Sequence, residues 1–174
     1  EQPIVVNGHL GRFAICTNGL INNIQEIVRG LDRDYSFAYV NDGVLNRTEI
    51  VARIIISGES IVDGIEKVFH SVKGSISLLL LSEEERCIYA ARDKLGHFPL
   101  ILGENDDFFA VTTETTAFSN LGLKIKKELR PGEIITISCE NIWQRKEGRS
   151  HEQICAFLWV YTGFPASEYE GKNV

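Results

Sequence analysis

The stretch VKGSISLLLL, residues 72–81, marks a change of pattern in this 174-residue chain. Before Gly74, apolar residues recur at the three- and four-residue spacing of amphipathic helices. After it, short apolar runs alternate with turn residues, which is typical of antiparallel strands. Because helices and later strands are partly segregated along the chain, we expect an α+β fold of layers rather than a doubly wound parallel sheet.

Three helices are predicted in the first half of the chain. The first follows Asn23, the second follows Asn46 and the third begins at Ser60, and each of these residues is expected to cap its helix. Glu49 stands three residues after Asn46 and completes a capping box there. The second and third helices are joined by about two residues, so we expect them to pack antiparallel.

The second half of the chain is predicted to be mostly strands. Turn residues such as Pro131-Gly132 separate them, and the polar stretch 145–152 is expected to be a loop. The expected strands are residues 75–81, 87–91, 99–102, 108–113, 124–129 and 133–138.

Composition excludes several classes of protein. A hydrophobic fraction of 44% and a charged fraction of 24% are ordinary for a globular domain. No apolar run approaches the roughly 18 residues that span a bilayer. The net charge of −6 argues against a nucleic-acid partner. A local basic cluster (Lys124, Lys126, Lys127 and Arg130) is interpreted as the solvated face of a strand, since apolar residues stand between the charges.

The cysteines and the chain start favour a cytoplasmic protein. Cys16, Cys87, Cys139 and Cys155 lie far apart and match no zinc-binding spacing, so reduced thiols are expected. The first residues have neither the basic nor the apolar region of a signal peptide. The four histidines are also widely separated and predict no metal site.

Eight short motifs stand in order along the chain. They are QPIVVN (residues 2–7), ICTNG (15–19), TE (48–49), VKGSISL (72–78), AARDKLGHFPL (90–100), TETTAF (113–118), LRPGE (129–133) and CAFLWVY (155–161). The series resembles class II glutamine amidotransferases, whose nucleophile is an N-terminal residue, and within them the amidophosphoribosyltransferases. The resemblance covers nearly the whole chain. It implies a four-layer αββα sandwich, incomplete here at its N-terminus.

The resemblance also implies a division of the chain and a reaction. Residues 1–166 are expected to be the C-terminal two-thirds of a glutaminase domain, and residues 167–174 the start of a linker to a phosphoribosyltransferase domain. In such enzymes an N-terminal cysteine attacks the glutamine amide, with its own α-amino group as general base. The ammonia released is passed to phosphoribosylpyrophosphate and gives phosphoribosylamine, the first step of purine synthesis.

Site residues follow from the resemblance at two places. Asn18 and Gly19 stand where similar enzymes supply the oxyanion donors, an Asn side chain and the next Gly N–H; a plain Asn-Gly turn is the alternative. Arg47 occupies the slot that usually holds an Asp for the ammonium group of glutamine. Arginine suits an ammonium group poorly, so Arg47 is either a functional change or a solvated residue at a helix start. Asp42 could replace the missing carboxylate only in a rearranged loop.

Cofactors are expected in the parent protein rather than in this stretch. The resemblance implies magnesium there, and Cys155 stands where some relatives place one of four iron–sulfur ligands, which leaves a cluster open. His97 and Asp93 lie in the 90–100 motif, where Asp93 is expected to accept backbone hydrogen bonds. The expected partners are glutamine, phosphoribosylpyrophosphate and further copies in a homo-oligomer.

The nucleophile is not in the sequence, because position 1 is Glu1. We therefore expect this stretch alone to be inactive and to belong to an amidophosphoribosyltransferase. Two alternatives stay open. One is a degenerate amidotransferase-like binding module, which Arg47 favours, and the other is the glutaminase part of an asparagine synthetase, which shares the pattern of residues 92–100.

Overall fold

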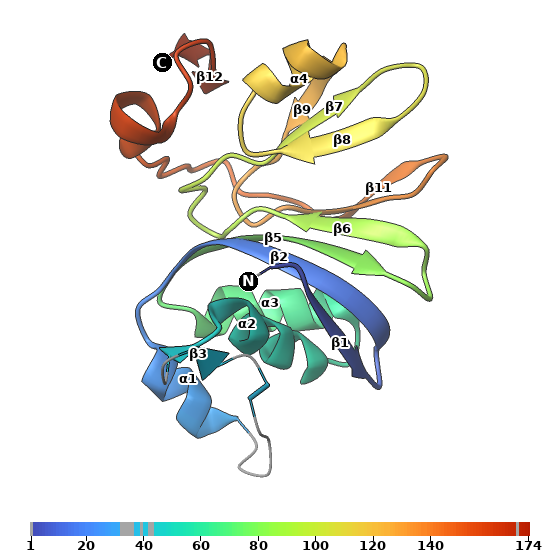
Figure 1. The fold of residues 1–174 in the computed structure, drawn as a ribbon, viewed down its shortest axis with the longest axis vertical. Coiled ribbons are helices and arrows are strands. Elements are labelled where there is room, and N and C mark those ends of the chain that lie inside the picture. Colours follow the sequence, from blue (N-terminus) through green and yellow to red (C-terminus); the bar gives the residue numbers. More distant parts are fainter. Residues whose placement is uncertain (1, 32–36, 39, 42–43, 170) are drawn as a thin grey trace. The chain divides into compact units, whose positions relative to one another are not determined.

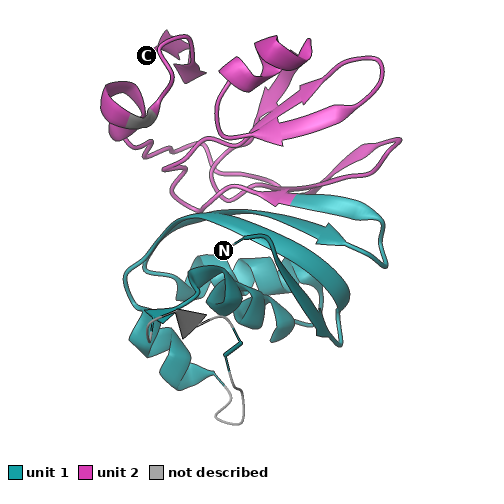
Figure 2. Ribbon diagram, viewed as in Figure 1, with its two compact units in different colours: residues 1–89 teal, residues 90–174 magenta. Residues whose placement is uncertain are grey.

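The computed structural model describes residues 2–31, 37–38, 40–41, 44–169 and 171–174. The chain divides into two compact units, residues 1–89 and residues 90–174 (Figure 2). The first unit contains the strands β1 (Ile4–Gly8), β2 (Gly11–Ile21), β3 (Val40–Asn41), β4 (Val44–Leu45) and β5 (Gly74–Ser82), and the helices α1 (Ile24–Gly30), α2 (Arg47–Ile56) and α3 (Ile61–Ser71). Strand β6 (Cys87–Ala91) crosses the boundary between the two units.

The sheet of the first unit is built around the long strand β2. It pairs antiparallel with β1 on one side and with β5 on the other. Alternate residues of these strands are buried toward α2 and α3, which lie against one face of the sheet (Figure 1). Phe13, Ile15 and Leu80 are each 1% exposed or less on that face. The predicted separation of helices and antiparallel strands is therefore confirmed for this unit.

Two of the three predicted helix caps are confirmed. The side chain of Asn46 accepts a hydrogen bond from the Thr48 N–H at the start of α2, and that of Ser60 accepts from the Asp63 N–H at the start of α3. The cap at Asn23 is wrong, since its side chain makes no cap hydrogen bond. The Asn23 carboxamide instead bonds the backbone at the end of α3, where it donates to one carbonyl and accepts from the Lys73 N–H.

Helices α2 and α3 pack closely because a glycine lies between them. A Cβ on Gly64 of α3 would stand 2.3 Å from the backbone oxygen of Ile55 in α2. Any side chain there would force the two helices apart. The connection between them is short, as predicted, but it is longer than the expected two residues, since α2 ends at Ile56 and α3 begins at Ile61.

The second unit contains small antiparallel sheets. One is three-stranded with the order β8–β7–β9 and another is the hairpin of β12 and β13, while β10 and β11 pair antiparallel with each other as part of the six-stranded sheet β1–β2–β5–β6–β10–β11. Ile101, Phe118 and Leu123 form a buried cluster beside the three-stranded sheet. The elements are β7 (Ile101–Glu104), β8 (Phe109–Thr112), α4 (Thr116–Leu121), β9 (Lys124–Glu128), β10 (Ile134–Ile137), β11 (Ile142–Lys146), a π-helical turn (Leu158–Thr162), β12 (Glu168–Tyr169) and β13 (Lys172–Asn173).

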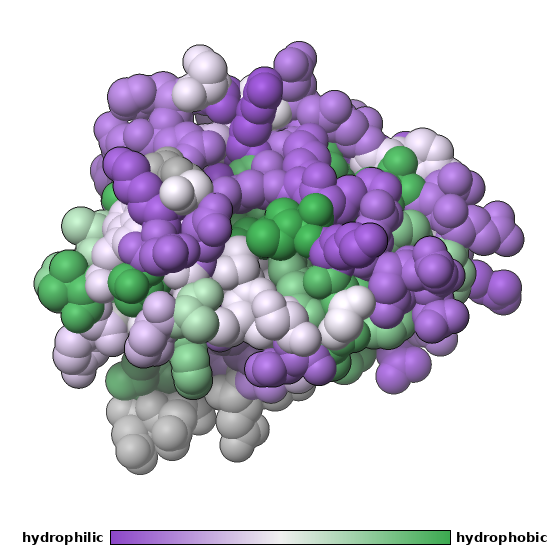
Figure 3. All heavy atoms as spheres, turned by 90° about the horizontal axis from the view of Figure 1, so that it is seen from above, coloured by the Kyte–Doolittle hydropathy of each residue, from purple (hydrophilic) through white to green (hydrophobic). Residues whose placement is uncertain are grey.

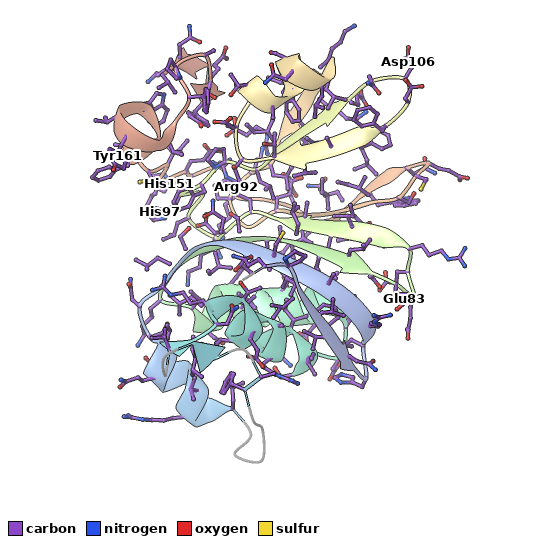
Figure 4. The ribbon with its side chains drawn as sticks, in the orientation of Figure 1. Glu83, Arg92, His97, Asp106, His151 and Tyr161 are labelled. Atoms are coloured by element: carbon purple, nitrogen blue, oxygen red, sulfur yellow. The ribbon has the colours of Figure 1, made fainter. Side chains whose placement is uncertain are left out.

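A buried arginine organises the loops of the second unit. Arg92 is fully buried, and its guanidinium donates to the backbone oxygens of Gly96, Phe98 and Leu129. Two carboxylates, those of Glu128 and Glu152, lie 3.4 and 3.5 Å from the same guanidinium. Arg92 therefore satisfies carbonyls from two segments inside the unit, residues 96–98 and Leu129, and lies near His97 in Figure 4.

The segment 167–174, assigned to a linker from the sequence, has local structure here. Strands β12 and β13 pair as a short hairpin, and Tyr169 is 2% exposed. The Ser167 hydroxyl lies 2.8 Å from that of Thr116, and the Glu168 N–H donates to the Thr115 hydroxyl. These contacts hold the described part of the segment against the start of α4.

The surface agrees with the charge pattern. The basic cluster lies mainly on β9, where Lys126 pairs with Glu104 at 2.5 Å and Lys127 pairs with Glu133. The interpretation is confirmed for Lys124 and Lys126, which are exposed on this strand, whereas Lys127 is half-buried and Arg130 lies beyond the end of β9. On the face drawn in Figure 3, hydrophobic residues form separate groups among hydrophilic ones. None of the described helices is both long and apolar enough to cross a membrane.

Candidate active site

The candidate site is described from Thr17 of β2, whose backbone and whose side chain each have a hydrogen-bond partner. The Thr17 N–H donates to the Gln2 side-chain oxygen at 2.5 Å, and the Gln2 side-chain nitrogen donates to the Thr17 oxygen at 3.0 Å. The carboxamide of Gln2 thus pairs with Thr17 as a strand neighbour would. The Thr17 hydroxyl lies 2.8 Å from the hydroxyl of Thr48, in the first turn of α2. These hydrogen bonds fix the position of the β2 backbone immediately before Asn18.

Asn18 points the other way. Thr17 faces α2, so the alternation along a strand places the Asn18 side chain on the opposite face of the sheet. Asn18 is exposed, and its carboxamide has no hydrogen-bond partner within the described part of the chain. An exposed NH₂ group on a fixed strand is available to an incoming ligand.

Gly19 has a backbone that only glycine tolerates. Its φ is +142°, and a Cβ there would stand 1.9 Å from the backbone oxygen of Ser75 on β5. The paired strand thus approaches so closely that a side chain cannot fit. Asn18 and Gly19 lie inside β2, not in a hairpin turn, so the alternative of a plain Asn-Gly turn is wrong.

Arg47 is the first residue of α2, and its side chain is exposed. The next two residues are nearly inaccessible: Thr48 is 1% exposed and Glu49 is 2% exposed. Glu49 accepts a hydrogen bond from the Ala38 N–H at 2.9 Å, so its carboxylate is turned inward. Because a guanidinium carries only donors, Arg47 could bind an anionic group but not an ammonium. Asp42, considered above as a substitute, lies outside the described residues.

Cys155 does not stand among other metal ligands in the described residues. No group of three His, Cys, Asp or Glu side chains suited to a metal ion occurs there. Cys155 is half-buried and its N–H donates to the His97 oxygen at 2.9 Å. The described residues alone do not supply the four ligands of a cluster, so iron–sulfur binding and magnesium binding stay predictions.

The motif of residues 90–100 is structural in this unit. Asp93 is 1% exposed and accepts from the Leu95 N–H at 2.9 Å, which confirms its predicted role in the turn. Its carboxylate lies 3.9 Å from the His97 ring. Figure 4 labels four residues of the second unit: Arg92, His97, His151 and Tyr161.

A hollow of about 380 Å³ lies on the sheet of the first unit, away from Asn18. Ala14 is the lining residue nearest to Asn18 along β2, and the four residue steps from one to the other span roughly 13 Å of strand. The walls are mostly apolar, with charged residues at the rim. The full lining is Val5, Arg12, Phe13, Ala14, Leu81, Ser82, Glu83 and Arg86.

Sequence reasoning missed the residues that support the site. Gln2, Thr17 and Thr48 all lie in the motifs quoted above, but their mutual contacts span 15 and 31 residues of sequence. These polar side chains lie near Asn18, but this becomes apparent only when the strand pairing is known.

Comparisons with known proteins identify the family to which the chain belongs. Residues 1–120 match a family described as the glutamine amidotransferase domain. The amidophosphoribosyltransferase of Archaeoglobus fulgidus is 24% identical over 99% of this chain and 38% of its own length. That of Bacillus subtilis is 28% identical over 99% of this chain and 36% of its length. The chain thus spans well under half the length of these relatives.

Solved structures show the same fold. The glutamine phosphoribosylpyrophosphate amidotransferase of Bacillus subtilis, solved with ADP and GMP, matches with a TM-score of 0.83 and 25% identity. The match covers 99% of this chain and 37% of that one. A structure described as the allosteric regulatory enzyme of purine biosynthesis matches with a TM-score of 0.82 and 25% identity. These matches confirm the expected α+β fold of N-terminal-nucleophile hydrolases, and with the family match they establish that the chain belongs to the glutamine amidotransferase domain family.

Proposed function

We propose that this chain is the glutamine-hydrolysing part of an amidophosphoribosyltransferase. In that role it binds glutamine in the cytoplasm, releases ammonia, and supplies it for the conversion of phosphoribosylpyrophosphate to phosphoribosylamine. The proposal is supported by relatives of that activity that match 99% or more of the chain. Those relatives are more than twice as long, so the second half of the reaction belongs to the longer protein.

The observation that carries the proposal is the backbone at Asn18 and Gly19. An exposed carboxamide precedes a glycine that the neighbouring strand forces into a φ of +142°. Amide hydrolysis passes through a tetrahedral intermediate whose oxygen becomes negative. Donors held in place before the reaction stabilise that oxygen, because no reorganisation is needed as the charge develops. The side-chain NH₂ of Asn18 and the N–H of Gly19 are suited to be these donors.

The reaction also needs a nucleophile, which the resemblance assigns to a cysteine at a free amino terminus. Its thiol attacks the carboxamide carbon of glutamine, and its α-amino group takes the thiol proton. The carbonyl electrons move to the oxygen near Asn18 and Gly19. Their return breaks the bond to the amide nitrogen, which takes the proton back from the α-ammonium group and leaves as ammonia, so that a thioester remains. Water then hydrolyses the thioester to glutamate and regenerates the thiol.

Arg47 makes the selection of glutamine itself a separate question. An exposed guanidinium at the start of α2 repels the substrate ammonium group if that group binds nearby. We propose that Arg47 weakens glutamine binding without changing the chemical step. Arg47→Asp then lowers KM for glutamine and leaves kcat unchanged, while an unchanged KM would place the ammonium group elsewhere.

The test of the glutaminase proposal is Asn18→Ala in the full-length gene product. We expect glutamine hydrolysis to fall by roughly 10²–10³-fold in kcat. Asn7→Ala is the matched control, because Asn7 is an exposed asparagine on β1 of the same sheet. Equal rates for the two variants, or a wild-type protein that releases no ammonia from glutamine, would contradict the proposal.

A further inference from the structure

Ser75 on β5 has a buried hydroxyl that the fold does not use. The residue is 6% exposed, and its Oγ has no hydrogen-bond partner among the described residues. Burying a hydroxyl without a partner costs free energy, so such groups are rare in native structures and need an explanation. The carbonyl of the same residue is the atom that approaches Gly19.

Strand register places this hydroxyl beside the candidate oxyanion donor. Asn18 pairs with Ser77, and Leu20 pairs with Ser75. Residues that pair directly lie on the same face of a sheet, so Ser75 and Asn18 share a face and are diagonal neighbours. Such neighbours have Cβ atoms roughly 7 Å apart, a gap that a carboxamide and a hydroxyl can close to hydrogen-bond distance.

A carboxamide that acts as an oxyanion donor must be held in one orientation. Its oxygen and its NH₂ group have nearly the same shape, and rotation by half a turn exchanges a donor for an acceptor. An acceptor facing the oxyanion would repel it. A hydroxyl that donates to the carboxamide oxygen removes this ambiguity, because the NH₂ group must then point outward.

We propose that Ser75 is a positioning residue: its Oγ–H donates to the Asn18 Oδ1 and thereby turns the Asn18 NH₂ group toward the substrate. The catalytic consequence rests on the glutaminase function proposed above. The proposed hydrogen bond itself does not, since forming it requires only that two side chains on one strand pair rotate toward each other. The two claims can therefore be tested separately.

The first experiment uses the full-length gene product and needs no activity. The side-chain NH₂ resonances of Asn18 are assigned by their loss in Asn18→Ala. We expect them to shift in Ser75→Ala and to stay in place in Ser82→Ala. Ser82 is the matched control, because it is a buried serine of the same strand whose hydroxyl accepts from the Glu85 N–H at 3.2 Å. Unchanged Asn18 resonances in Ser75→Ala would overturn the proposal.

The second experiment measures glutamine hydrolysis by the full-length gene product. Ser75→Ala is expected to lower kcat roughly tenfold with little change in KM, the loss of about one ordinary hydrogen bond in the transition state. Ser75→Thr keeps the hydroxyl and is expected to restore most of the rate. Ser82→Ala is expected to retain the wild-type rate.

A double-mutant cycle separates positioning from a general structural effect. Once Asn18 is alanine, Ser75→Ala should cause no further loss of rate, because the group that Ser75 orients is gone. A full tenfold loss in that background would overturn the proposal. Urea unfolding gives the structural comparison. Ser75→Ala removes the proposed hydroxyl hydrogen bond and Ser82→Ala removes the observed one, so each should lower the midpoint to a similar small extent. An equal loss of rate in both variants would also overturn the proposal, because the loss would then follow stability rather than the orientation of Asn18.

Discussion

Replacement of Gly19 by alanine tests the backbone geometry on which the candidate site depends. The new Cβ would stand 1.9 Å from the Ser75 oxygen and 2.7 Å from the Ser75 carbonyl carbon. Both are backbone atoms, so no side chain can rotate out of the way. The φ of +142° is also unfavourable for alanine. We expect Gly19→Ala to separate β2 from β5 at this point.

The cost has two parts. A non-glycine residue in such a sparsely populated conformation costs about 1–3 kcal/mol. Relief of the clash requires the strands to move apart by about 1.5 Å, since carbon contacts normally begin near 3.4 Å. That shift breaks one or two ladder hydrogen bonds, at about 1 kcal/mol each. We therefore expect Gly19→Ala to lower the free energy of unfolding by roughly 3–5 kcal/mol.

Substitutions at two other glycines allow the conformational cost and the cost of the clash to be measured separately. Gly122 has a φ of +65°, but no heavy atom lies within 4 Å of the point where its Cβ would stand, so Gly122→Ala bears only the conformational cost of about 1–2 kcal/mol. Gly30 ends α1 with neither a positive φ nor a close neighbour. Gly30→Ala is expected to be neutral or to stabilise by up to about 1 kcal/mol, because alanine favours the helix.

The assay must report on the correct unit. Both tryptophans, Trp143 and Trp159, lie in the second unit, so their fluorescence follows unfolding around Gly122. Hydrogen exchange of the amides in β2 and β5 measures the effect at Gly19, and exchange of the amides in α1 measures the effect at Gly30. If Gly19→Ala costs no more than Gly122→Ala, the close approach of Ser75 to Gly19 does not exist in solution, and the argument for a preformed oxyanion donor loses its basis.

Three further predictions concern the framework around the site. Arg92→Ala is expected to cost about 3–5 kcal/mol in urea unfolding, because it leaves buried carbonyls and carboxylates without their partner, whereas exposed Arg12→Ala should cost at most about 1 kcal/mol. Asn46→Ala removes the cap of α2 and should cost about 1 kcal/mol, while Asn23→Ala removes no cap and should leave the exchange of α1 amides at its N-terminus unchanged. Burial raises the pKa of Tyr169 above its ordinary value, so absorbance titration should show it ionising late; stability should fall as pH rises from about 10 through that pKa, and Tyr169→Phe should remove this part of the loss.

The elements that could be predicted from sequence are those governed by local patterns. Asn46 and Ser60 cap α2 and α3 as expected because their bonds reach only two or three residues ahead. Asn23 has the same local signal, but its carboxamide bonds residues 71 and 73 instead. A contact about 50 residues away thus competes with a local cap, and no local pattern reveals which of them forms.

The candidate site shows the same contrast between local patterns, which can be predicted from sequence, and long-range contacts, which cannot. Asn18 and Gly19 were identified because they stand in a recognisable order of motifs, and the role of Arg47 was questioned for the same reason. The anchoring of Thr17 by Gln2 and Thr48 depends on strand pairing and on the position of a helix, neither of which is encoded in a short window. Sequence therefore pointed to the place but not to the contacts that make it rigid.

The Asn-Gly dipeptide shows why register decides between two meanings of one pattern. In a hairpin turn, glycine follows asparagine because the chain must reverse. In β2 the chain does not reverse after Gly19, and the strand continues to Ile21. Glycine is required here by the carbonyl of Ser75 across the ladder, not by a turn. The constraint comes from a residue far along the sequence, and it leaves Asn18 on a supported strand where its amide can meet a substrate.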